Sequence, residues 1–135
     1  MYILDSDVCI ELMRGNMPAV REVLEHTSPR LIKIPAVVRY ELVCGALKSA
    51  HPEKNLLITE TFLAPFETLP FDARCAVAAA RIRADLESKG QKIGPTDLLI
   101  AGTAQAHGGV LVTRNTREFA KVGNLALETW DDIEW

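Results

Sequence analysis

Short apolar runs alternate with longer helical patterns along most of this 135-residue chain. Runs of only three or four apolar residues are typical of buried strands, whereas the segments between them repeat apolar residues at helical spacing. This alternation predicts an α/β protein with a short central parallel sheet that is flanked by helices on both faces, a three-layer arrangement. Because no linker divides a chain of this length, we expect a single domain over residues 1–135.

Capping residues, glycines and prolines place the boundaries of the predicted elements. Asp72 is a good N-cap for a long Ala-rich helix, and Gly90 follows its end. The predicted strands cover residues 2–4, 31–34, 66–69, 110–112 and 125–128. The predicted helices cover residues 8–14, 18–26, 36–49, 52–63, 73–89 and 96–107.

Composition excludes several classes of protein. The net charge of −3 argues against a broad basic surface for non-specific nucleic-acid binding, although it allows a local one. No apolar run is long enough for a membrane helix and no leader peptide is recognisable, so we expect a cytoplasmic protein without a membrane partner. Cys9, Cys44 and Cys75 are scattered, which favours buried thiols over disulfides or a zinc site.

Polar residues follow the first and fourth predicted strands. Asp5 and Asp7 come after residues 2–4, and Thr113 and Asn115 come after residues 110–112. In parallel α/β folds, ligands bind beyond the carboxyl ends of the strands where the strand order reverses. These residues therefore lie where chemistry is expected, although Asn115 alone could also serve a turn.

Two helical acids are further candidates for this site. Glu41 has apolar neighbours on its helical face, where an unpaired charge is costly, so its carboxylate is expected to be paired or to bind metal. Alternatively, Glu41 lies at the edge of that face and its carboxylate reaches solvent. Asp97 falls in the first turn of a helix that Thr96 can cap, and its apolar continuation indicates a buried helix. Favourable interaction with the helix N-terminus could explain Asp97 by itself.

Four windows taken together resemble the PIN-domain ribonucleases, and in particular the VapC-type toxins of type II toxin–antitoxin systems. The windows are LDSDVCIELMRG, VVRYELVCGA, IGPTDLLIAGTAQAHGGVLVTRNTREF and the tail ALETW, and they span nearly the whole chain. The resemblance implies a PIN-like domain with a catalytic site at Asp5, Glu41, Asp97 and Asn115.

Family members use Mg²⁺ or Mn²⁺, and hard cations of this kind prefer oxygen ligands. By resemblance, Asp5 and Asp97 hold the metal, and Glu41 binds it through water or orients the nucleophile. The supporting residues are Ser6, Asp7 and Thr113. The family often has an acidic residue at the position of Asn115. Because that charge is missing here, we expect one firmly bound ion, with Asp7 partly replacing the missing charge.

The resemblance also implies a function and partners. We expect an endoribonuclease that cleaves structured RNA such as tRNA and thereby inhibits translation and growth. The expected partners are RNA, a cognate antitoxin and a second copy of the chain in a homodimer, with DNA reached only indirectly through the antitoxin. Expected phosphate contacts are Arg14, Arg114 and Arg117, although surface ion pairs explain these residues equally well.

Two alternatives remain open from the residues alone. An apolar run before D-x-D-V also opens haloacid-dehalogenase-like phosphatases, in which Asp5 would be a nucleophile. That scheme needs a late pair of acids, and the late Asp pair is Asp131–Asp132 at the end of the chain. A non-catalytic partner-binding domain is the second alternative, with a groove lined by apolar residues of the first two helices: Leu12, Met13, Val20, Val23 and Leu24.

Overall fold

The computed structural model describes residues 1–130 and has a five-stranded sheet in the order β3-β2-β1-β4-β5. Every neighbouring pair of strands is parallel. Tyr2 of the central strand pairs with Ile32 on one side and with Val110 on the other. The strands are β1 (Tyr2–Leu4), β2 (Ile32–Pro35), β3 (Glu67–Leu69), β4 (Val110–Val112) and β5 (Leu127–Glu128).

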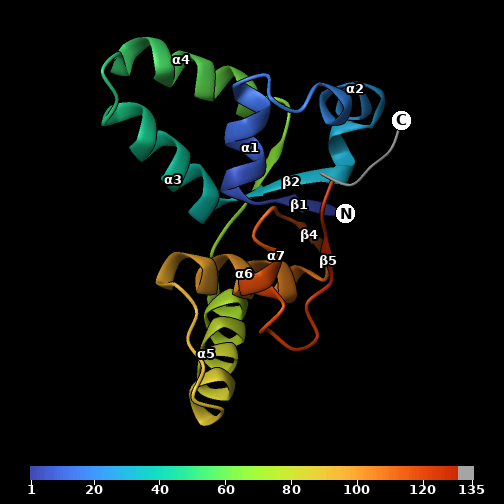
Figure 1. Cartoon of the computed structure of the whole chain (residues 1–135), viewed down its shortest axis with the longest axis vertical. Helices are drawn as coiled ribbons and strands as arrows, with labels where there is room; N and C mark the ends of the chain where they lie inside the picture. The colour runs from blue at the N-terminus through green and yellow to red at the C-terminus, as the bar shows by residue number, and fades with distance from the viewer. Residues whose placement is uncertain (131–135) are drawn as a thin grey trace.

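Helices cover both faces of this sheet, so the α/β class and the layered arrangement are confirmed. Figure 1 shows α1 to α4 on one side of the strands and α5 to α7 on the other. The helices are α1 (Ser6–Met13), α2 (Pro18–His26), α3 (Ala36–Leu47), α4 (Pro52–Leu63), α5 (Ala73–Ser88), α6 (Pro95–His107) and α7 (Thr116–Phe119). No helix among residues 1–130 is both long and apolar enough to cross a membrane.

The core lies on both sides of the strands. Ile3 and Leu4 of β1 and Leu111 and Val112 of β4 are fully buried, which explains why these strands are continuously apolar instead of alternating. Phe119 is the largest fully buried side chain among the described residues, and it anchors α7. The cysteines are unpaired thiols, as the sequence predicts, with Cys9 and Cys75 buried and Cys44 half-buried.

Some predicted boundaries are wrong for local reasons. Helix α1 begins at Ser6 and not at residue 8, because Asp5 is its N-cap. A 3₁₀ turn, Pro29–Leu31, precedes β2, so Leu31 lies outside the strand and is 49% exposed. Helix α6 begins at Pro95 after Gly94, so Thr96 lies inside its first turn and is not the cap. The short helix α7 was not expected.

Candidate active site

The polar residues expected beyond the sheet lie at its topological switch point. The chain passes from β1 outward to β2 and β3, then returns to place β4 on the other side of β1. Asp5 follows β1 and Thr113 follows β4, and the backbone N–H of Asp5 donates to Val112 O at 2.9 Å. The two strand ends are thus joined where α/β folds commonly bind ligands.

Asp5 is held rigidly at this point. Its Oδ1 accepts from the backbone N–H of Ser6 at 2.8 Å, and its Oδ2 accepts from the Thr113 hydroxyl at 2.7 Å. Asp5 is only 4% exposed and Thr113 is fully buried. Burial, together with the charges of Asp7 and Asp97, raises the pKa of Asp5 to about 7 despite these two hydrogen bonds.

Glu41 joins the site from helix α3. The Ser6 hydroxyl donates to Glu41 Oε1, which connects the first turn of α1 with the middle of α3. Glu41 also borders a cavity of about 390 Å³ between α1, α3 and α4, whose other lining residues include Ile10, Met13 and Asn55. Its carboxylate is therefore paired and half-buried.

Asp97 approaches the same cluster from the N-terminus of α6. Burial raises the pKa of Asp97, and the neighbouring charges of Glu41, Glu118 and Asp7 raise it further. The charge of Asp97 in turn adds to the raised pKa of Asp5. Asp5, Glu41 and Asp97 come from separate windows of the sequence, and in the structure they lie close enough for the charge of one to raise the pKa of another.

Glu118 is a site residue that the sequence reasoning missed. It lies on α7, and its charge contributes to the raised pKa of Asp97. The Oε2 atom of Glu118 is shielded from solvent and lies 2.6 Å from Lys121 Nζ. The sequence offered one signal for the helix that carries Glu118. In the pattern N-T-R-E an acid stands three residues after Asn115, and this spacing is typical of the start of a helix.

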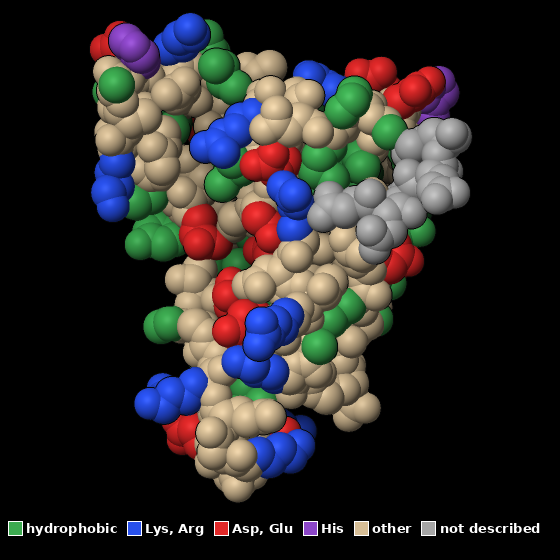
Figure 2. All heavy atoms as spheres, viewed as in Figure 1, with side chains coloured by type: hydrophobic (Ala, Val, Ile, Leu, Met, Phe, Trp, Pro, Cys, Tyr) green, Lys and Arg blue, Asp and Glu red, His purple; other side chains and the backbone are tan. Residues whose placement is uncertain are grey.

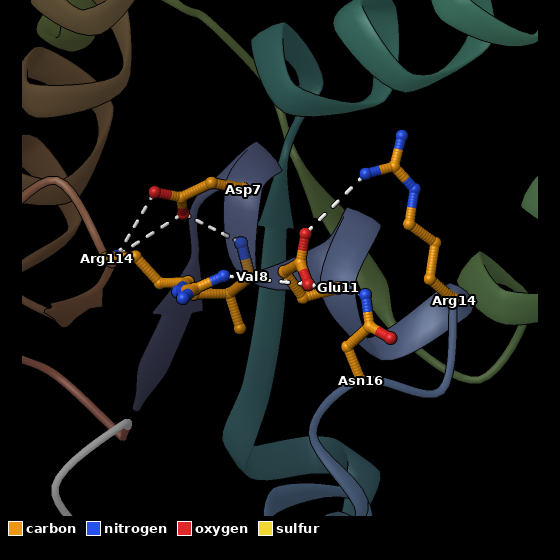
Figure 3. A network of polar contacts seen from close by, with 6 residues as sticks. All are labelled: Asp7, Val8, Glu11, Arg14, Asn16 and Arg114. Atoms are coloured by element: carbon orange, nitrogen blue, oxygen red, sulfur yellow. Dashed lines mark hydrogen bonds and ion pairs between the residues drawn. The ribbon is translucent and has the colours of Figure 1, made fainter.

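Asp7 and two of the expected phosphate contacts belong to one polar network around α1 (Figure 3). Asp7 accepts from the backbone N–H of Val8 at 2.7 Å and from that of Arg114 at 3.2 Å. The guanidinium groups of Arg14 and Arg114 each lie 3.6 Å from a carboxylate oxygen of Glu11. Both arginines thus form ion pairs at the edge of the site.

The remaining expected residues lie on the β4–α7 connection. Asn115 is the N-cap residue of α7, and its backbone N–H donates to the Thr113 hydroxyl at 2.9 Å. Thr113 therefore links Asn115 to Asp5 by accepting one hydrogen bond and donating another. Arg117 is exposed on α7. The catalytic role of Asn115 and the phosphate contact of Arg117 stay predictions.

The cluster fits a hard divalent cation by its donor chemistry. Acidic side chains gather near the middle of the face seen in Figure 2, with Lys and Arg side chains beside them. Among residues 1–130, no three Asp, Glu, His or Cys side chains already surround one point as a ligand set. Mg²⁺ commonly uses one or two carboxylates and retains several waters, so Asp5 and Asp97 would be sufficient protein ligands.

Comparison with known proteins agrees with this arrangement. The PIN domain family matches residues 2–125. The chain is 39% identical to the tRNA(fMet)-specific endonuclease VapC of Shigella flexneri, over 96% of this chain and 97% of that relative. It is 36% identical to ribonuclease VapC2 of Rickettsia felis, over 97% of this chain and 98% of that protein.

The crystal structure of DNA-bound VapBC from Salmonella typhimurium superposes with a TM-score of 0.91 at 36% identity, covering 96% of this chain and 97% of that one. The structure of VapBC2 from Rickettsia felis, bound to a promoter DNA fragment, gives a TM-score of 0.90, also at 36% identity, and covers 96% of this chain and 98% of that one. The sheet order, the acidic cluster at the switch point and these full-length matches lead to one conclusion: the chain belongs to the PIN-domain family.

Proposed function

We propose that this chain is a Mg²⁺- or Mn²⁺-dependent endoribonuclease and the toxin of a VapC-type toxin–antitoxin pair. The observation that carries the proposal is the convergence of Asp5, Glu41 and Asp97 at the switch point of a PIN-domain sheet. The relatives named as VapC ribonucleases match over nearly their whole length, which supports RNA as the substrate.

We assign each residue of the cluster a role that is consistent with its position in the site. Asp5 and Asp97 would hold the cation, and Asp5 is oriented by Ser6 N–H and the Thr113 hydroxyl. Glu41, held by the Ser6 hydroxyl, orients the attacking water. A bound cation would lower the pKa of that water and offset negative charge on the phosphate.

The partner implied by the VapBC neighbours is an antitoxin, and the chain has an apolar surface suited to one. A cavity of about 670 Å³ lies between α1, α2 and α4, and its lining is mostly apolar: Met13, Leu24, Leu57, Ile58 and Phe62. Of the residues expected to line such a groove, Leu12 and Val20 instead belong to the core. An amphipathic antitoxin segment would bury the exposed part of this surface.

The alternative functions have less support. The acid pair that a haloacid-dehalogenase-like phosphatase would need, Asp131–Asp132, lies outside the described residues, and the family match is to PIN domains. A purely partner-binding role does not explain why buried Asp5 is fixed by two hydrogen bonds beside other acids. Both alternatives predict no metal-dependent cleavage of RNA.

Cleavage of RNA by the purified chain tests the proposal, with transfer RNA as the first substrate. We expect cleavage with Mg²⁺ or Mn²⁺ and none with EDTA. The Asp97→Asn variant should lose more than about a hundredfold in cleavage activity, because loss of a direct metal ligand costs more than loss of a residue that only hydrogen-bonds to a ligand. Asp85→Asn is the matched control, since Asp85 lies on α5 in an exposed ion pair with Lys89. Full activity of Asp97→Asn in the presence of metal would refute the assignment.

A further inference from the structure

Lys121 connects two segments that border the acidic cluster. Its Nζ lies 2.6 Å from Glu118 Oε2 on α7 and donates to the backbone carbonyl of Lys92 at 3.1 Å. Lys92 belongs to the loop between α5 and α6, shortly before Asp97. One ammonium group therefore ties α7 to the loop that leads into the helix carrying Asp97.

Lys121 and Glu118 are less exposed than a surface ion pair of α5. Their side chains are 32% and 39% exposed, against 58% and 50% for Lys89 and Asp85, and the Oε2 atom of Glu118 is itself shielded from solvent. Partly buried charge pairs are screened less by water and salt than exposed ones. Lys121 stands three residues after Glu118, and its ammonium group is in direct contact with that carboxylate.

We propose that Lys121 is a positioning residue that supplies the resident counter-charge of the carboxylate cluster, holding Glu118 and the Lys92 loop in place before a divalent cation binds. The inference rests on the metal-dependent function proposed above. Repulsion among the carboxylates of Asp5, Glu41, Asp97 and Glu118 destabilises the metal-free protein, and the nearby ammonium offsets part of it. A bound cation relieves the same repulsion, so Lys121 then contributes less.

The test compares Lys121→Met with the unaltered protein in EDTA and in saturating Mn²⁺. We expect Lys121→Met to melt at a lower temperature in EDTA and to recover most of the difference in Mn²⁺. Calorimetric titration should show Mn²⁺ binding roughly fivefold tighter, because a repelling positive charge is gone. Lys121→Arg keeps the charge and should behave like the unaltered protein in both measurements.

Lys89→Met is the matched control, because Lys89 forms a 3.1 Å ion pair with Asp85 outside the cluster. The difference in melting temperature between Lys89→Met and the unaltered protein should be nearly the same with and without Mn²⁺. The double variant Glu118→Gln, Lys121→Met removes both charges and should melt higher in EDTA than Lys121→Met, since the Glu118 carboxylate is no longer left without its partner. This double variant keeps the test decisive if the single variant folds poorly.

Two results would overturn the inference in different ways. If Lys121→Met loses as much stability in Mn²⁺ as in EDTA and binds Mn²⁺ with unchanged affinity, Lys121 is a structural tether and the metal-dependent function stands. If the unaltered protein gains no stability from Mn²⁺ at all, both this inference and the proposed metal site fail. The melting temperatures of the unaltered protein in EDTA and in Mn²⁺ therefore separate the two failures.

Discussion

At the scale of single residues, the surroundings of Asp5 disfavour its charged form. This residue is buried, fixed by Ser6 and Thr113, and faces the charges of Asp7 and Asp97, which together with burial bring its pKa to about 7. A carboxylate in this position holds a proton readily when no cation is present. Proton and cation therefore compete for the same oxygen atoms.

This competition predicts a pH dependence of stability. Because the pKa of Asp5 rises from 3.8 to about 7 on folding, the folded protein binds the proton more tightly, and the free energy of unfolding falls as pH rises between about 4 and 7. In EDTA, the protein should melt at a higher temperature at pH 5.5 than at pH 8. In Mn²⁺ the added stability should instead grow with pH, because Asp5 must lose its proton to bind the cation.

Asp5→Asn is the decisive variant for that measurement. It cannot titrate, so its melting temperature in EDTA should vary much less with pH, and at pH 8 it should exceed that of the unaltered protein. Asp85→Asn, on the exposed face of α5, should keep the full pH dependence. An unchanged pH profile in Asp5→Asn would show that Asp5 does not titrate in this window.

At the scale of elements, the crossing of α5 and α6 determines where Asp97 lies. The two helices pack tightly at Gly102, where an added Cβ would lie 2.7 Å from Ala79 Cβ and 2.9 Å from Ala79 N. The Ala79 backbone cannot move aside as a flexible side chain could. The Asp72 side chain fixes the start of α5 by accepting from Cys75 N–H at 3.1 Å.

Gly102→Ala should therefore destabilise the protein by about 1–3 kcal/mol, as overpacking of a core does. The control is Gly45→Ala on α3, where nothing lies within 4 Å of the added Cβ and helix propensity predicts a gain of up to about 1 kcal/mol. Chemical denaturation of both variants measures the two values. A neutral Gly102→Ala would mean that the helices separate at little cost.

At the scale of the whole molecule, apolar side chains remain exposed on several helices. Tyr40 and Leu47 on α3 are 66% and 57% exposed, and Val77 on α5 is 53% exposed. Exposed apolar residues are common singly, but a toxin that associates with a second copy and an antitoxin would bury some of them. The homodimer itself stays a prediction from the family resemblance.

Light scattering during size-exclusion chromatography tests the dimer at micromolar concentration. We expect a mass near twice the 14.9 kDa of one chain. The mass should not depend on Mn²⁺, because apolar contacts would hold the copies together. A mass of one chain at every concentration tested would contradict the prediction.

The sequence by itself determined the α/β class, most element boundaries and the acids of the cluster other than Glu118. These features depend on near neighbours: apolar runs mark β1 and β4, Asp72 caps α5, and the windows around Asp5, Glu41 and Asp97 carry the family resemblance. Even the errors were local, as at the start of α1, where Asp5 serves both as the N-cap and as a site residue.

Only the tertiary structure decided which side chains pair within the site. Ser6 meets Glu41 across 35 positions of sequence, and Thr113 meets Asp5 across 108, because the strand order places β4 beside β1. The same folding brings the charge of Glu118, on the unexpected helix α7, close to Asp97 and places Lys121 against the backbone carbonyl of Lys92. Periodicity reports whether a residue is buried, whereas its partner depends on how distant segments pack, and that is set by the fold as a whole.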